Sequence, residues 1–140
     1  MDAVVKQLNK IQAEAHAFYV AFHDYHWNVK GMQFYSIHEY TEHAYDDMAE
    51  RALTIGGKPL ISIDEIVKAG KGAPVEAKGD YTADAVLVNM QKAYEHLKAE
   101  FIKLEEVAEK AGDQTTVAMA QEGYAKLEKS LWMLRQVLSK

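Results

Sequence analysis

The chain has 140 residues, of which 49% are apolar and 26% are charged, a composition typical of one globular domain with a single core. A formal net charge of −5 disfavours a general nucleic-acid binder, which needs a basic patch or tail. The chain has no cysteine, which excludes disulfides and thiolate metal sites. It shows no signal peptide and no apolar run that would span a membrane, so we expect a single cytoplasmic domain over residues 1–140.

The first predicted element is an amphipathic helix that ends near Gly31. Its apolar residues follow one another at steps of three and four: Val4, Leu8, Ile11, Ala15, Phe18, Phe22 and Tyr25. A second helix is predicted to begin near Ser36, because Glu39 three residues later completes a capping box. The sequence Gly56-Gly57-Lys58-Pro59 predicts its end.

The second half of the chain contains a short helix and two long ones. Ser62 to Ala69 is predicted to be the short helix, and a glycine-rich loop follows it. The third long helix is predicted from about Thr82 to Gly112, and the fourth from there to about Leu138. These patterns predict an all-α four-helix bundle with a short extra helix between the second and third helices. The second helix is predicted to span about 30 Å, against about 35–43 Å for the others.

The strongest functional pattern lies on the second predicted helix. His38, Glu42, Asp46 and Glu50 are spaced four residues apart, so they form one line on the helix surface. His26 stands across a short connection from them. Histidine nitrogen with carboxylate oxygen suits iron, manganese or zinc.

The alternative for this line is an ordinary solvated face. Like charges four residues apart destabilise a helix, however, and Arg51 is the only balancing cation nearby in the sequence. We therefore favour a metal site. His16, His23 and His96 are assigned no ligand role.

The sequence also predicts where the site lies. A di-iron site inside one bundle uses a Glu-x-x-His pair on each of two helices. None of the six histidines has a glutamate three residues before it. The candidate ligands lie on an outer face, so we expect a site between two subunits related by a two-fold axis.

Several motifs resemble those of the Dps family of mini-ferritins, and in particular its neutrophil-activating and peroxide-resistance type. They cover the whole chain: His26-Trp27-Asn28-Val29-Lys30-Gly31, Phe34, His38, Asp46, Glu50-Arg51, Gly56-Gly57-Lys58-Pro59 and Glu128-Lys129-Ser130-Leu131-Trp132-Met133-Leu134. The resemblance implies a ferritin-like bundle and a hollow shell of twelve subunits.

The resemblance further implies a ferroxidase that stores iron and protects against oxidative stress. Fe(II) would be oxidised by hydrogen peroxide or O2 at inter-subunit di-iron centres. His26, His38 and Glu42 would bind iron from one chain, and the partner's Asp46 and the partner's Glu50 from the other. Trp27 would lie beside the metal and quench a stray oxidising equivalent. The lysine-rich tail with which some members bind DNA has no counterpart here, so DNA binding is not expected, nor is a membrane partner.

One feature departs from the family pattern. Asp46 follows His38 by eight residues, and in the family the corresponding aspartate lies about seven residues, or two helical turns, further on. A missing heptad shortens the helix by about 10.5 Å and turns its faces by only about 20°. We therefore expect an altered interface or assembly. Two alternatives remain open: a scaffold cage, natural or engineered, with an impaired ferroxidase site, and, less favoured, a DNA-compacting protein.

Overall fold

The computed structural model describes residues 2–30 and 39–139. These ranges contain, in chain order, α1 (Asp2–Asn28), β1 (Val29–Lys30), α2 (Glu39–Thr54), α3 (Ile63–Ala69), β2 (Tyr81–Thr82), α4 (Ala83–Lys110) and α5 (Gln114–Leu138). The prediction of a mostly helical fold with a short helix between the second and third bundle helices is confirmed. None of the described helices is long and apolar enough to cross a membrane.

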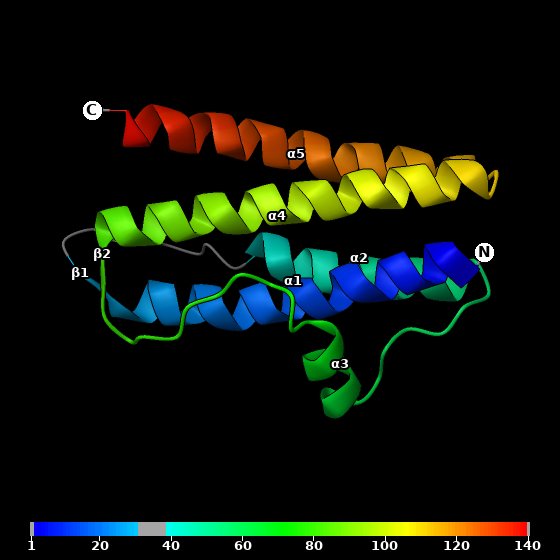
Figure 1. The fold of residues 1–140 in the computed structure, drawn as a ribbon, viewed down its shortest axis with the longest axis horizontal. Helices are drawn as coiled ribbons and strands as arrows, with labels where there is room; N and C mark the ends of the chain where they lie inside the picture. The colour runs from blue at the N-terminus through cyan, green and yellow to red at the C-terminus, as the bar shows by residue number, and fades with distance from the viewer. Residues whose placement is uncertain (1, 31–38, 140) are drawn as a thin grey trace.

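The four long helices pack side by side, with α1 against both α2 and α4, and α4 against α5 (Figure 1). The apolar face predicted for α1 is buried along its whole length, from Val4 to Tyr25. Leu97, Phe101 and Leu104 of α4 are buried in the same core. The three-four spacing thus identified the core-facing side of these helices.

The ends of three helices follow from local residues. Ser62, Thr82 and Asp113 are the N-caps of α3, α4 and α5, and each side chain accepts a hydrogen bond from the backbone N–H three residues later. Gly112 has φ = 72°, a left-handed conformation that ends α4 at little steric cost. The capping box predicted from Ser36 and Glu39 lies outside the described residues.

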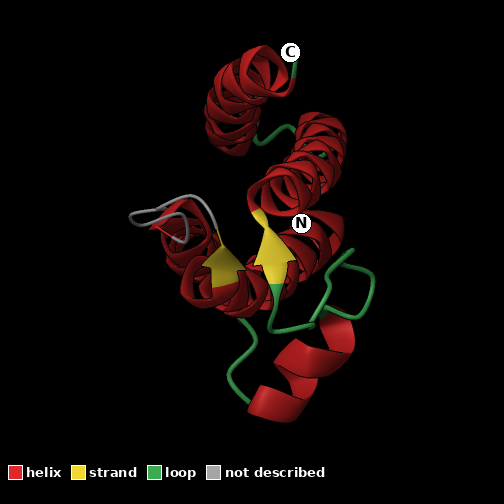
Figure 2. Ribbon diagram, turned by 90° about the vertical axis from the view of Figure 1, so that its left-hand side faces the viewer, coloured by secondary structure: helices red, strands yellow, loops and turns green. Residues whose placement is uncertain are grey.

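Two short strands were not predicted. Val29 of β1 pairs in parallel with Tyr81 of β2, and Lys30 pairs with Thr82 (Figure 2). Strands of two residues are too short to produce an alternating pattern, so no sequence signal predicts them. Their pairing holds the start of α4 beside the end of α1.

The described part of the second long helix, α2, has 16 residues and begins directly after the undescribed residues 31–38, so its predicted short length stays a prediction; α1, α4 and α5 have 27, 28 and 25 residues. Among the described residues, α2 packs extensively against α1 alone. A cavity of about 370 Å³ separates it from α5, bordered by Ala44 and Met48 of α2 and by Met119 and Gly123 of α5. The bundle is therefore incompletely closed on the side of α2.

Candidate metal centre

The three carboxylates predicted on the second helix lie on the exposed side of α2. Glu42, Asp46 and Glu50 are exposed, whereas Ala44 and Met48 on the opposite side are buried. The structure records no ion pair between these three carboxylates and any described residue. The face is thus open to solvent within one chain.

Arg51 does not neutralise this line of carboxylates. Its Nη2 lies 3.1 Å from Asp113 Oδ1, and its Nε donates a 2.9 Å hydrogen bond to Thr116 Oγ1. The guanidinium therefore turns toward the start of α5. Arg51, the cation that would balance the line of carboxylates, is instead paired with Asp113.

The other predicted residues lie near the end of α1. His26 is partly buried there, and the neighbouring Trp27 is 71% exposed. The centre of the Trp27 ring lies 5.3 Å from that of His23, one turn earlier in the helix, and the two ring planes are tilted by 58°. His38 lies outside the described residues.

The described part of one chain does not bring these predicted ligands together. Only one group of three or more possible ligands, Glu14, His96 and Glu100, has its ligand atoms within 4.8 Å of one another in the described ranges. His26, Glu42, Asp46 and Glu50 belong to no such group. A centre built from them needs residues of another subunit or of the undescribed segment.

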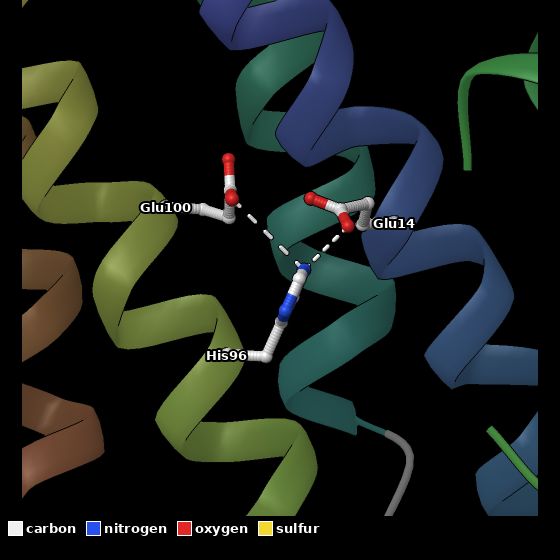
Figure 3. Close-up of side chains that lie close together, drawn as sticks. All are labelled: Glu14, His96 and Glu100. Carbon is white, nitrogen blue, oxygen red and sulfur yellow. Dashed lines mark hydrogen bonds and ion pairs between the residues drawn. The ribbon is translucent and has the colours of Figure 1, made fainter. Parts of the chain in front are cut away.

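The group that does converge joins α1 to α4 (Figure 3). His96 Nε2 lies 2.5 Å from Glu14 Oε2 and 4.0 Å from Glu100 Oε1. Glu14 is fully buried and Glu100 is 2% exposed, while His96 is partly buried. One imidazole and two carboxylates therefore face one another inside a single chain.

Glu100 is well neutralised. Its Oε1 accepts hydrogen bonds from Lys10 Nζ at 3.2 Å and Lys103 Nζ at 3.3 Å, and its Oε2 accepts one from Gln7 Nε2 at 2.8 Å. Burial pushes the pKa of Glu100 upward, but these three donors outweigh burial and leave the pKa below its ordinary value. Glu100 is therefore a carboxylate at neutral pH.

Glu14 is less well compensated. Burial raises its pKa, and the hydrogen bond and charge of His96 offset only part of that rise. Its Oε1 is buried and has no hydrogen-bond partner among the described residues. The chain after α3 covers the carboxylate, because a Cβ on Gly72 would lie 3.6 Å from Glu14 Oε2. Phe18 meets the His96 ring edge-on at 6.0 Å and helps to orient it.

The sequence interpretation missed this group. The sequence pattern assigns no ligand role to His96, Glu14 or Glu100. The local signal is weak: Glu14 stands between Ala13 and Ala15 on α1, and His96 and Glu100 are four residues apart on α4. Nothing in the sequence, however, shows that α1 and α4 pack so that Glu14 lies next to His96.

The chain is similar to known proteins along almost its whole length. The family model described as Ferritin-like domain matches residues 5–140. The chain is 37% identical to the DNA protection during starvation protein of Helicobacter pylori, over 94% of this chain and 96% of the relative. It is 36% identical to DNA protection during starvation protein 2 of Bacillus anthracis, over 97% of each. The chain belongs to the Dps family of ferritin-like proteins.

A solved structure supports this assignment. The crystal structure of Helicobacter cinaedi CAIP superposes with a TM-score of 0.91 at 34% identity, and the match covers 97% of this chain and 99% of that one. The described helices therefore have the arrangement found in that protein.

The lengths of these two matches also bear on the predicted missing heptad. The match to the Helicobacter pylori protein extends over 139 residues but covers 94% of 140 residues here, which is about 132 residues. About seven positions of that relative thus have no counterpart in this chain. The Bacillus anthracis match, 143 residues over 97% of this chain, gives the same difference of about seven. The size of the difference equals the heptad that the motif spacing predicts to be missing.

Proposed function

We propose that this protein is a Dps-type ferroxidase that oxidises Fe(II) and stores the ferric product inside a hollow homo-oligomer, protecting against oxidative stress. The observation that carries the proposal is the line of Glu42, Asp46 and Glu50 on α2. All three are exposed and lack an ion-pair partner among the described residues, and Arg51 is turned toward Asp113. Glu42 and Asp46 form one like-charged pair four residues apart, and Asp46 and Glu50 form another; such pairs destabilise a helix. A cation bound between these carboxylates and a partner subunit would remove the repulsion.

The proposed centre lies between two subunits. His26, His38 and Glu42 of one chain would face the partner's Asp46 and the partner's Glu50. A two-fold axis would generate two equal centres from these residues. This arrangement agrees with the exposed position of the carboxylates and with the absence of a cluster containing them among the described residues of one chain.

Iron is the substrate of the proposed reaction. Imidazole and carboxylate ligands bind Fe(II), and the anionic oxygens stabilise the Fe(III) product. Two Fe(II) ions each give one electron to hydrogen peroxide, whose O–O bond breaks, and two protons complete two molecules of water. Because the electrons are delivered as a pair, no hydroxyl radical is released. The exposed Trp27 ring, next to His26, is placed to give up an electron when only one iron is bound.

The test is a double variant, His26→Ala with Asp46→Ala. We expect its rate of Fe(II) oxidation by peroxide to fall toward the uncatalysed rate. The matched control is His43→Ala with Asp47→Ala, which removes the same two residue types from a region of α2 that borders the cavity beside α5. The control should retain the parent rate. If the His26/Asp46 variant also oxidises iron at the parent rate, the site assignment is wrong.

A scaffold cage with an impaired centre is the second candidate. The observation that favours it is the shortfall of about seven residues against the two Dps relatives. A shorter helix changes the distance between its two ends, so the two halves of an inter-subunit centre need not meet. Weak iron binding by an intact oligomer would support this candidate over the ferroxidase.

A further inference from the structure

We propose that Glu14, His96 and Glu100 form a second metal site, contained within one subunit and distinct from the proposed inter-subunit centre. The site would take one divalent first-row transition ion that accepts nitrogen and oxygen ligands, such as Zn²⁺ or Co²⁺. The ligands come from α1 and α4 of the same chain. The site is therefore complete without a partner subunit.

The distances suit such an ion. Ligand atoms about 2.0–2.2 Å from a tetrahedral Zn²⁺ lie about 3.4 Å from one another. The two separations at His96 Nε2, 2.5 Å to Glu14 and 4.0 Å to Glu100, fall on either side of this value. Shifts of less than about 1 Å in the side chains would bring both carboxylates to bonding distance.

The unused oxygen of Glu14 points to a ligand. Glu14 is fully buried, and its Oε1 has no hydrogen-bond partner among the described residues. Figure 3 shows this second oxygen turned toward the side on which Glu100 lies. A buried carboxylate oxygen without a partner is costly in a protein interior, and a cation between the two carboxylates would satisfy it.

The charges around Glu14 and Glu100 also favour a bound cation. Among the described residues, Glu100 forms ion pairs with two lysines, whereas Glu14 forms one with His96 alone. Both lysines are flexible and reach Glu100 from more exposed positions, with side-chain exposures of 42% for Lys10 and 55% for Lys103. They can swing into solvent when a divalent ion takes their place at Glu100 Oε1. Lys103 is thus a competitor for the site and not a ligand.

The experiment measures Co²⁺ binding by visible absorption, with the full-length His26→Ala/Asp46→Ala protein as the starting material. That background removes two ligands of the proposed inter-subunit centre, so this test is independent of iron oxidation. We expect one Co²⁺ per chain. Adding Glu14→Gln should weaken the affinity at least about tenfold, since even loss of an outer-shell partner costs about 10–100-fold. Adding Glu95→Gln, which changes an exposed neighbour of His96, should leave it unchanged.

A second variant tests the site without altering a buried residue. Lys103→Gln removes one ammonium from Glu100 Oε1, so we expect Co²⁺ to bind several-fold more tightly. Lys110→Gln, an exposed lysine two turns further along α4, is the control and should bind as the background protein does. Equal affinities in Glu14→Gln and Glu95→Gln, or in Lys103→Gln and Lys110→Gln, would overturn the proposal. Glu14 and His96 would then be a structural ion pair.

Discussion

At the scale of single residues, Asp113 connects three helices. Its carboxylate caps α5 through Thr116 N at 3.1 Å and pairs with Arg51 of α2 at 3.1 Å. Asp113 is also the first residue after α4 and its glycine turn. One side chain therefore joins the end of α2 to the α4–α5 corner.

Asp113→Ala is expected to destabilise the fold by about 2 kcal/mol, because the change removes a helix cap and leaves the partly buried Arg51 without its ion-pair partner. Denaturant unfolding gives the free energy of unfolding directly. Glu109→Ala is the control: Glu109 is an exposed acid in the last turn of α4, and its removal should cost nothing. A loss of less than about 0.5 kcal/mol in Asp113→Ala would show that the junction is not stabilising.

The Asp113 junction should also make stability depend on pH. Burial pushes the pKa of Asp113 upward, but the Thr116 hydrogen bonds and the Arg51 charge outweigh it, so the pKa lies below its ordinary value. A depressed carboxyl pKa contributes stability that is complete above the unfolded-state pKa of about 3.9 and is lost as pH falls through the folded-state value. The stability difference between the parent and Asp113→Asn should therefore be larger at pH 6 than at about pH 3. A difference that grows on acidification would contradict this sign.

At the scale of the elements, what the sequence predicts depends on how local the cause is. The apolar face of α1 and the starts of α3 near Ser62 and of α4 near Thr82 depend on residues within a turn or two, and the sequence predicts them. The convergence of Glu14 with His96 depends on the height at which α1 and α4 cross, 82 residues apart in sequence. Spacing along one helix does not contain that information.

In the candidate inter-subunit site too, features with a local cause are predictable from the sequence and tertiary contacts are not. Spacing placed Glu42, Asp46 and Glu50 on one face, and the structure shows that this face is exposed. The commitment of Arg51 to Asp113, which leaves that face without its cation, is a tertiary contact that no pattern reveals. The β1–β2 pairing escaped prediction for the same reason.

Restoring a heptad tests what the length of α2 controls. A seven-residue insertion between Tyr45 and Asp46 should lengthen α2 by about 10.5 Å and turn its C-terminal part by only about 20°. With apolar residues that continue the Ala44 and Met48 side, it should raise the rate of iron oxidation if the short helix impairs the centre.

A five-residue insertion at the same point is the control. It adds a similar length but turns the following residues by about 140°, which moves Asp46 and Glu50 off the outer face. Equal oxidation rates in the two insertion variants would mean that the side of α2 on which these carboxylates lie does not affect iron oxidation.

At the scale of the whole molecule, the net charge of −5 argues against DNA as the main partner. Four lysines border a cavity of about 970 Å³ near the start of α1: Lys6, Lys10, Lys58 and Lys103. Lys10 and Lys103 are engaged by Glu100, which leaves a small basic area.

We expect any binding of duplex DNA to disappear by about 150 mM salt, because few phosphate contacts are available. Fluorescence anisotropy across a salt series measures this. The variant Lys6→Gln/Lys58→Gln should remove what remains at low salt. Binding that persists at about 150 mM would return DNA compaction to consideration.

Exposed apolar side chains indicate where a single chain is incomplete. Ile61, Ile63 and Val67, on α3 and the segment before it, are 87%, 78% and 53% exposed. Side chains of this kind gathered on one short element are typical of an interface. Figure 1 shows α3 standing out from the four long helices, where another subunit can reach it. We therefore expect Ile63→Ser/Val67→Ser to reduce the size of the oligomer, and Asp64→Ser between them to have little effect.

The size of that oligomer decides what the short α2 does to the assembly. Twelve chains of 15.8 kDa would have a native mass of about 190 kDa. A shell fixes the distance between its two-fold axes, and a helix shortened by about 10.5 Å cannot keep every contact along its length. We therefore expect a native mass, measured by light scattering, that differs from the dodecamer. A mass of about 190 kDa would instead show that the shell tolerates the shorter helix. His26, His38 and Glu42 would then remain opposite the partner's Asp46 and the partner's Glu50 as proposed.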